Sequence, residues 1–389
     1  MIFKSTHQLP IRFLIVIFFA LLIPTSLAFS KAKILIPAAP KIAAKSYYLQ
    51  DADSGKVLAE NNADEKLAPA SLTKIMTIYI IFKELSSGHL TLDELVTISN
   101  KAWRTPGSRM FVEVNKQVSV EDLLKGVIIQ SGNDASVALA EHVGGDEATF
   151  SQLMNQHAAR LGMINTHFTN SMGLPDEQHY STAKDLALLT RALISEYPDY
   201  YAWFADKEFT FNDITQKNRN SLLWRDDSVD GVKTGHTEAA GYCLVASAKR
   251  DDMRLISVVM GTNSNNSRAS ANQSLLNYGF RFFETHRLYK SQDVLSEPRV
   301  WKGEKQNLKL GIVEDLYVTI PRRHYKELKA NMTIDNNIMA PVKKGHTLGI
   351  VDVSLAGEKI ASKPLIALEN INEGSLYQRL SDEALLMIK

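Results

Sequence analysis

Two residues in the stretch APASLTKIMTIYIIF (68–82) have side chains and a spacing suited to nucleophilic chemistry. Ser71 and Lys74 are three positions apart, which places both side chains on one face of a helix. The residues that follow are almost all apolar, so the Lys74 ammonium group is predicted to be partly desolvated, and desolvation lowers the pKa of a lysine. A neutral amine beside a hydroxyl acts as a general base, and the hydroxyl then becomes a nucleophile.

The Ser-x-x-Lys spacing is weak evidence by itself, because it occurs at Ser30–Lys33, Ser71–Lys74 and Ser181–Lys184. Only the second places its lysine in a long apolar run. The alternative interpretation is a serine that caps a helix, followed by a lysine that extends its ammonium group to solvent. The pair alone favours this alternative.

Two further motifs favour catalysis instead. Ser131-Gly132-Asn133 lies between two predicted helices, and Lys233-Thr234-Gly235 lies at the start of a predicted strand region. Each motif is weak alone, since the first is also an ordinary polar turn and the second an ordinary strand end. Their order after Ser-x-x-Lys, on a helix start, a loop and a strand, is typical of penicillin-binding proteins and serine β-lactamases.

The resemblance extends beyond these motifs. The chain resembles the D-alanyl-D-alanine carboxypeptidases, the low-molecular-weight penicillin-binding proteins, over nearly its whole mature length. The stretches that carry the resemblance are PASLTKIMT, QSGNDAS, NTHF, NRNSLLW, DGVKTGHTEAAGYCLVASA, MRLISVVMG and LLNYGFRFFET. About 60 residues separate Ser71 from Ser131, which leaves no room for the large extra domains of endopeptidase-type relatives.

The resemblance implies three catalytic residues. Ser71 attacks the carbonyl between the two terminal D-alanines of a peptidoglycan stem peptide and becomes acylated, while Lys74 takes its proton. Ser131, helped by Lys233, relays a proton to the departing D-alanine. Water then hydrolyses the acyl-enzyme, and neither a metal nor another cofactor is required.

The resemblance also implies a substrate-binding set. Asn133 binds the substrate backbone and helps to hold Lys74. Lys233 and Thr234, within the motif that Gly235 completes, meet the terminal carboxylate with help from Arg268. The backbone N–H groups of Ser71 and His236 would hold the oxyanion, and such preorganised donors usually supply a large part of catalysis. The same site would bind β-lactam antibiotics covalently.

The surrounding elements predict an α+β fold. Strand pairs are predicted at 46–60 and 241–262, and helices are predicted between the pairs and after the second one. This order predicts an antiparallel sheet with an inserted helical subdomain, in agreement with the transpeptidase domain that the resemblance implies. The predicted helices run from Ser71 to near Gly88, from Ser119, and over 134–143, 149–162, 180–197 and 270–284.

Short strand candidates about ten residues apart follow His286 and predict a small β-sandwich. Lys4 and Arg12 precede an apolar run and a small-x-small site that ends at Ala28, which is the pattern of a secretory signal peptide. The predicted organisation is a signal peptide at 1–28, a DD-peptidase catalytic domain at 29–285, a β-rich domain at 286–372 and a helical tail at 373–389.

We therefore expect an exported protein in the periplasm, peripheral on the inner membrane, with possible membrane contact through residues 375–389. The net charge of +1 does not indicate a nucleic-acid partner. The single cysteine, Cys243, is predicted to be a small buried residue of a strand. Glu177 and His179 are predicted to belong to a polar loop before a helix rather than to assist deacylation.

Two other functions remain open. A serine β-lactamase would need the Glu-x-x-x-Asn signature between the second and third motifs, and that signature does not occur between Asn133 and Lys233. A non-catalytic module that binds peptidoglycan would not need the full set of catalytic residues.

Overall fold

The predicted strand pair at 241–262 forms the centre of an antiparallel sheet in the computed structural model, which describes residue 1 and residues 34–387. β8 (Gly241–Arg250) and β9 (Met253–Thr262) are joined by a tight turn in which Asp251 has a left-handed φ of 53°. The five-stranded sheet has the order β2-β1-β9-β8-β7. Its other strands are β1 (Ser46–Asp51), β2 (Val57–Asn61) and β7 (Val229–Thr237).

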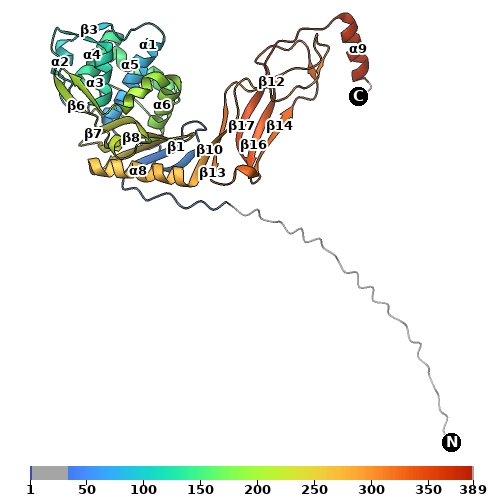
Figure 1. Ribbon diagram of the computed structural model, residues 1–389, viewed down its shortest axis with the longest axis horizontal. Coiled ribbons are helices and arrows are strands. Elements are labelled where there is room, and N and C mark those ends of the chain that lie inside the picture. The colour runs from blue at the N-terminus through green and yellow to red at the C-terminus, as the bar shows by residue number, and fades with distance from the viewer. Residues whose placement is uncertain (2–33, 388–389) are drawn as a thin grey trace. The chain divides into compact units, whose positions relative to one another are not determined.

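Helices cover one face of this sheet and form the larger hydrophobic core with it (Figure 1). The central helix α1 (Lys74–Ser86) is apolar on nearly all sides, and such a helix is expected to be buried. The helices around it are α2 (Asn100–Arg104), α3 (Val120–Ile129), α4 (Asn133–Gly144), α5 (Glu147–Arg160), α6 (Ala183–Glu196) and α7 (Pro198–Tyr201).

The opposite face of the sheet is covered by α8 (Asn265–Phe282). Leu275 and Leu276 of this helix pack with Leu49, Leu244 and Leu255 of the sheet in a second hydrophobic core. The sheet is therefore buried on both faces, which explains why β8 and β9 are almost continuously apolar.

Two small hairpins and several short 3-10 helices complete this part of the chain. The hairpins are β3 (Leu95–Thr97) with β4 (Gln117–Ser119), and β5 (Glu208–Phe211) with β6 (Ile214–Lys217). The 3-10 helices are η1 (Ala70–Thr73), η2 (Ala202–Ala205) and η3 (Ser221–Trp224).

The β-rich part that follows contains three small sheets, β10-β13, β11-β15 and β12-β17-β16-β14. The tail forms α9 (Leu376–Leu386), which Ser375 and Gln378 cap at its start. The strands are β10 (Phe283–Tyr289), β11 (Val300–Trp301), β12 (Leu310–Gly311), β13 (Leu316–Pro321), β14 (Leu328–Ile334), β15 (Ile338–Met339), β16 (Thr347–Leu355) and β17 (Glu358–Ala367), with η4 (Tyr325–Glu327) before β14.

The α+β prediction is confirmed, with three local differences. Ser71 lies in the 3-10 turn η1 rather than in the α-helix that begins at Lys74. α8 begins at Asn265, before the predicted start at 270, and therefore includes Arg268. β10 begins at Phe283 and pairs with β13, so the predicted boundary after residue 285 lies within a strand.

Two further observations concern the ends of the chain. The predicted signal peptide lies outside the described residues. Among the described residues, no helix combines the length and apolar character needed to cross a membrane.

Candidate active site

The turn η1 brings Ser71 and Lys74 together at the start of α1. Ala70 has a left-handed φ of 48°, and the short 3-10 turn then leads into the α-helix at Lys74. The Lys74 side chain is fully buried, and its Nζ lies 3.0 Å from the Ser71 Oγ. Burial is the main cause that lowers the pKa of Lys74, to about 7, and the nearby positive charge of Arg219 lowers it further. The desolvation expected from the sequence is confirmed.

The three contacts of the Lys74 Nζ indicate how this amine can act as a base. Besides Ser71, the Nζ donates to the Asn133 Oδ1 at 2.7 Å and to the Met172 carbonyl oxygen at 2.8 Å. Both of these oxygens can only accept hydrogen bonds, whereas the serine hydroxyl can also donate one. A neutral Lys74 amine has two N–H groups, and these can keep the hydrogen bonds to the two carbonyl oxygens. Its lone pair can then point toward the Ser71 hydroxyl.

The second motif lies between α3 and α4. Ser131 is almost fully buried with a left-handed φ of 65°, and its Oγ has no hydrogen-bond partner. A non-glycine residue held in this conformation is uncommon and is often found at functional sites. Asn133 begins α4, where its Nδ2 donates to the Pro106 carbonyl oxygen at 2.6 Å while its Oδ1 accepts from Lys74.

Asp134, the residue after this motif, organises the loop beside it. Its buried carboxylate accepts backbone N–H groups from Met110 at 3.0 Å, Phe111 at 2.9 Å and Val112 at 3.3 Å. Phe111 has a left-handed φ of 69° within this loop. The carboxylate thus accepts three successive backbone N–H groups of this loop and holds the loop next to Asn133.

The third motif lies on β7, an edge strand that packs against η1. A Cβ at Gly235 would lie only 2.9 Å from the Pro69 carbonyl oxygen, so glycine permits this close approach of the two segments. Arg268 donates to the carbonyl oxygens of Gly235 at 2.9 Å and Cys243 at 3.3 Å. These bonds connect α8 to the strand that carries the motif.

The site concentrates positive charge where an anionic group could bind. Lys233 is buried, and burial, followed by the charges of Lys74, Arg219 and Arg268, lowers its pKa well below the usual range. Burial also lowers the pKa of Arg268 to about 10 and lowers that of Arg219. A carboxylate bound among these cations would replace the lost solvation and favour their charged forms.

The predicted site residues are thus gathered at one place, although not all are in direct contact. Hydrogen bonds join Lys74 to Ser71 and Asn133. The Lys233 Nζ donates to the Thr234 carbonyl oxygen at 3.2 Å, whereas the unpartnered Ser131 Oγ receives no bond from it. Thr234 is buried, and His236 is exposed with its ring 4.0 Å from that of Tyr242.

Three features of the site were missed by sequence reasoning. The Arg219 Nε donates to the Gln130 carbonyl oxygen beside Ser131 at 2.9 Å. The Met172 carbonyl oxygen binds Lys74, in a loop where the Asn170 Oδ1 accepts the N–H groups of residues 172–174. Arg219 falls within NRNSLLW, which carried a usable signal, but a backbone carbonyl leaves no such signal in the sequence.

His179 is the third missed feature: it lies in a loop before α6, as predicted, but its side chain is buried and contacts the turn that carries Ser71. Its Nδ1 accepts the Thr169 N–H at 3.0 Å, so its Nε2 carries the proton and can donate to the Thr73 Oγ1 at 2.7 Å. Burial lowers the pKa of His179 to about 4. This neutral imidazole connects the 169–179 loop to the turn that carries Ser71.

An antiparallel sheet with a helical subdomain, and a serine–lysine pair next to SGN and KTG motifs, define an active-site serine enzyme of the penicillin-binding class. A family model described as D-alanyl-D-alanine carboxypeptidase matches residues 33–264, and one described as penicillin-binding protein 5, C-terminal domain, matches residues 283–373. The chain belongs to the D-alanyl-D-alanine carboxypeptidase family, and its activity is that of a serine DD-carboxypeptidase.

The similarity to known proteins extends over most of the chain. D-alanyl-D-alanine carboxypeptidase DacC of Escherichia coli K12 is 49% identical over 352 residues, which are 88% of each chain. DacA of the same strain is 45% identical over 364 residues, which are 91% of this chain and 90% of DacA. The crystal structure of penicillin-binding protein 5 from Haemophilus influenzae has a TM-score of 0.83 and 43% identity, and the match covers 87% of this chain and all of that one.

Proposed function

We propose that Ser71, Lys74 and Ser131 carry out the carboxypeptidase reaction. The proposal rests mainly on the contacts of Lys74, which is buried, has a lowered pKa and leaves only the Ser71 hydroxyl as a proton donor toward it. Lys74 takes the proton of Ser71 as the Oγ–carbon bond forms at the penultimate D-alanine carbonyl. The carbon–nitrogen bond then breaks, and the amine of the terminal D-alanine leaves with a proton relayed through Ser131.

Substrate binding is assigned to the cationic residues of the site. Lys233 and Thr234 of β7, with Arg268 of α8, would receive the terminal carboxylate, and Gly235 allows β7 to approach η1. Asn133 would bind the peptide backbone while holding Lys74. The oxyanion would lie at the backbone N–H groups of Ser71 and His236, and the first amides of a helical turn are free to donate to it.

Hydrolysis of the acyl-enzyme is expected to be slow for penicillin. A β-lactamase uses a glutamate to activate water, whereas the carboxylate that directly follows the second motif, that of Asp134, is buried and accepts backbone N–H groups of Met110, Phe111 and Val112. Losing one positioned base slows such a step by roughly 10²–10⁴-fold. Support also comes from a relative, penicillin-binding protein D2 of Listeria monocytogenes, solved in an ampicillin-bound form, with 30% identity and a TM-score of 0.58.

The test is mass spectrometry after incubation with penicillin and, separately, with a peptide ending in D-Ala-D-Ala. A stable adduct on Ser71 and a shortened peptide are expected. Turnover of penicillin many times per second would move the protein to the β-lactamase class, and the absence of both adduct and cleavage would favour a non-catalytic peptidoglycan-binding module.

We also propose that the protein is exported to the periplasm after cleavage near Ala28, and that the catalytic domain is followed by a β-rich domain that begins with β10 at Phe283 rather than after residue 285. The tail at 373–389 is proposed to contact the inner membrane weakly. Leu376, Tyr377 and Leu380 of α9 and Met387, which follows it, are exposed, and this exposure supports such contact. The acidic residues Asp382 and Glu383 pair with Arg299 and Lys302.

Cell fractionation with and without residues 375–389 tests the tail. A modest membrane share that falls on truncation is expected, since one short amphipathic helix without basic residues in excess binds a bilayer weakly. An unchanged membrane share after truncation rules out anchoring by the tail.

A further inference from the structure

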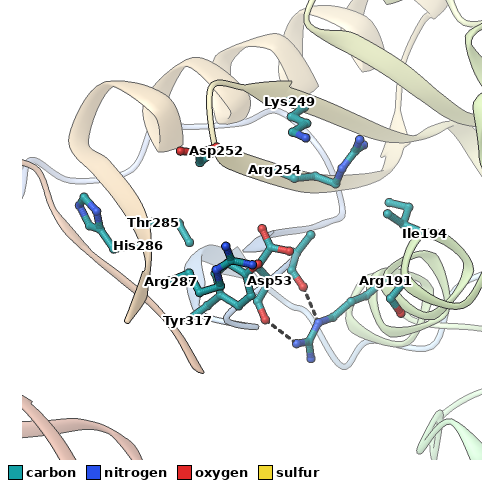
Figure 2. A pocket seen from close by; sticks show the side chains of 12 residues that line it. Asp53, Arg191, Ile194, Lys249, Asp252, Arg254, Thr285, His286, Arg287 and Tyr317 are labelled. Carbon is teal, nitrogen blue, oxygen red and sulfur yellow. Dashed lines mark hydrogen bonds between the residues drawn. The ribbon is translucent and has the colours of Figure 1, made fainter. Parts of the chain in front are cut away.

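A charged cavity lies away from the catalytic motifs, where the β8–β9 turn meets the start of the β-rich part (Figure 2). Its volume is about 590 Å³. Its charged lining includes Asp53, Arg191, Lys249, Asp252, Arg254 and Arg287. Gly235 pairs with Cys243 and Arg254 with Lys249 in the sheet register, so the cavity is about 20 Å along β8 from the third motif at 3.3 Å per residue.

Two of the cations in this cavity already have anionic partners. Arg254 pairs with Asp230 at 2.7 Å, and Arg287 pairs with Asp315 at 3.1 Å. Their charges are therefore largely compensated within the protein, and they contribute mainly hydrogen-bond donors to the cavity wall.

The other two cations lack such compensation. Arg191 donates its Nε to the Ala52 carbonyl oxygen at 2.6 Å and an Nη to that of Asp53 at 2.8 Å, and both of these partners are neutral (Figure 2). Lys249 is exposed at the cavity and forms no ion pair with any residue that the structure describes. The cavity therefore contains two cations that form no close ion pair with a carboxylate of the described residues.

Two carboxylates without a close ion pair lie in the same cavity. The carboxylates of Asp53 and Asp252 form neither ion pairs nor side-chain hydrogen bonds within the described part of the chain, although three cations surround Asp53. Loss of solvent, together with the nearby Asp51 carboxylate, raises the pKa of Asp53, so this carboxylate is less well stabilised than it would be in water. Opposite charges thus face the same space without pairing with each other.

We propose that this cavity binds a zwitterionic amino-acid group, with the ligand ammonium at Asp53 and the ligand carboxylate at Lys249 (Figure 2). A purely anionic ligand would be repelled by Asp53 and Asp252, and a purely cationic one by Lys249 and Arg191. A zwitterion satisfies both sets, because charge-assisted hydrogen bonds can form at each end. The volume exceeds that of a single amino acid and leaves room for a short peptide.

The established activity supplies two sources of this chemistry. The reaction releases free D-alanine, which is a zwitterion, and a stem peptide can carry a diamino acid whose side chain ends in the same group. The two sources share the ammonium and carboxylate but differ in size, so the experiment compares D-alanine with the diamino acid meso-diaminopimelate.

The position of the cavity gives binding a structural consequence. Beside it, Asp51 accepts from Thr285 at 2.7 Å, Thr285 and Thr319 share a hydrogen bond of 2.8 Å, and Ser54 contacts Thr319 at 2.6 Å. This buried network connects the sheet of the catalytic part to β10 and β13. A ligand that contacts Asp53 next to this network would stabilise the connection.

The test is isothermal titration calorimetry on the full mature chain with Ser71→Ala, so that no acyl-enzyme can form. D-alanine, meso-diaminopimelate, D-alanine methyl ester, N-acetyl-D-alanine and inorganic phosphate are titrated in turn. Repetition with penicillin-acylated wild-type protein separates binding in this cavity from binding at the catalytic residues, because the acyl group occupies the catalytic site. If penicillin forms no adduct, the catalytic assignment fails, but the Ser71→Ala titration still tests the cavity.

Binding of D-alanine or meso-diaminopimelate is expected, with at least about tenfold weaker binding of the methyl ester and of the N-acetyl compound, since one charged hydrogen bond is lost in each. Asp53→Asn and Lys249→Gln should each weaken zwitterion binding similarly, whereas the exposed control variants Asp227→Asn and Lys207→Gln should not. Tighter binding of the larger compound identifies the peptide as the source. Preferred binding of phosphate, equal binding of all alanine derivatives, or no heat with any compound would overturn the proposal.

Discussion

The chain contains the same pattern at two described helix starts, Ser71–Lys74 and Ser181–Lys184, and the structure gives the two pairs different surroundings. Lys74 is fully buried, and its Nζ contacts a hydroxyl and two carbonyl oxygens. The Lys184 side chain is 42% exposed and pairs with Asp64 at 3.2 Å. The Ser181 Oγ contacts the Thr166 Oγ1 at 2.8 Å. Burial and the lack of a carboxylate partner, rather than the spacing, make the first lysine a candidate base.

The two serines test this comparison most strongly. Ser71→Ala should abolish penicillin labelling and lower peptide hydrolysis by about 10⁴-fold or more, as removal of a nucleophile does in other serine enzymes. Ser181→Ala is the matched control and should keep both activities, although loss of its buried hydrogen bond should cost about 1 kcal/mol of stability. Mass spectrometry of the adduct and a D-alanine release assay measure the effects. Labelling of Ser71→Ala at another serine would refute the assignment.

Replacing Lys74 by arginine should have the next largest effect on acylation, with the same replacement of Lys184 as its control. Lys74→Arg should lower the acylation rate by roughly 10²–10⁴-fold, the usual contribution of a general base, because arginine does not lose its proton in proteins. Lys184→Arg keeps a cation beside Asp64 and should change the rate less than twofold. Stopped-flow acylation with a chromogenic cephalosporin provides the rates. A fully active Lys74→Arg enzyme would mean that Lys74 is not the base.

The sequence predicted which side chains form the candidate site better than it predicted the backbone geometry that holds them there. The order of motifs identified the side chains that meet at the site, because their types and separations are properties of the sequence itself. The left-handed backbone at Ala70 and Ser131 could not be predicted, since ordinary residues adopt it only when tertiary contacts require it. The Met172 carbonyl oxygen could not be predicted either, because every residue carries one and the tertiary fold selects which one reaches Lys74.

In the fold as well, some elements could be predicted from the sequence and others could not. The apolar strands 241–250 and 253–262 and the helical segments were predicted from their hydrophobic pattern. The two-residue strands β11, β12 and β15 were missed, because so short a run has no measurable periodicity and its pairing is fixed by distant partners. The early start of α8 was missed as well, because its first turn is polar and Ser264 caps it.

The pH dependence of acylation distinguishes a buried lysine base from an exposed lysine. The pKa of Lys74 is about 7, and its neutral form is the active one, so the rate should rise with pH through about 7 and then level off. Below the pKa, the rate should fall about tenfold per pH unit, since the neutral fraction falls by that factor. Acylation rates between pH 5 and 9 measure the curve, and a flat profile would contradict the role of Lys74.

Two variants should move this curve in opposite directions. The positive charge of Arg219 lowers the pKa of Lys74, so Arg219→Gln should shift the midpoint to higher pH. The Asp134 carboxylate raises the pKa of Lys74, so Asp134→Asn should shift the midpoint to lower pH. Asp134→Asn should also cost about 1–3 kcal/mol of stability, because it disturbs a buried acceptor of three N–H groups. A shift in the same direction for both variants would show that the changes act through structure rather than charge.

The smallest effect is expected for the ion pair between Lys184, the lysine of the second Ser-x-x-Lys pattern, and Asp64. Both side chains are well exposed to solvent. Their side chains are 42% and 57% exposed, so water screens the attraction and ordering two flexible side chains offsets much of it. A double-mutant cycle with Lys184→Met and Asp64→Asn should therefore give a coupling free energy below about 1 kcal/mol, as for other surface pairs. Chemical denaturation provides the stabilities, and acylation should be unchanged in all three variants because neither side chain bonds to Ser71 or Lys74. A coupling energy of several kcal/mol, or a loss of acylation, would show that Ser181–Lys184 is more than a surface copy of the pattern and would remove the contrast with Ser71–Lys74.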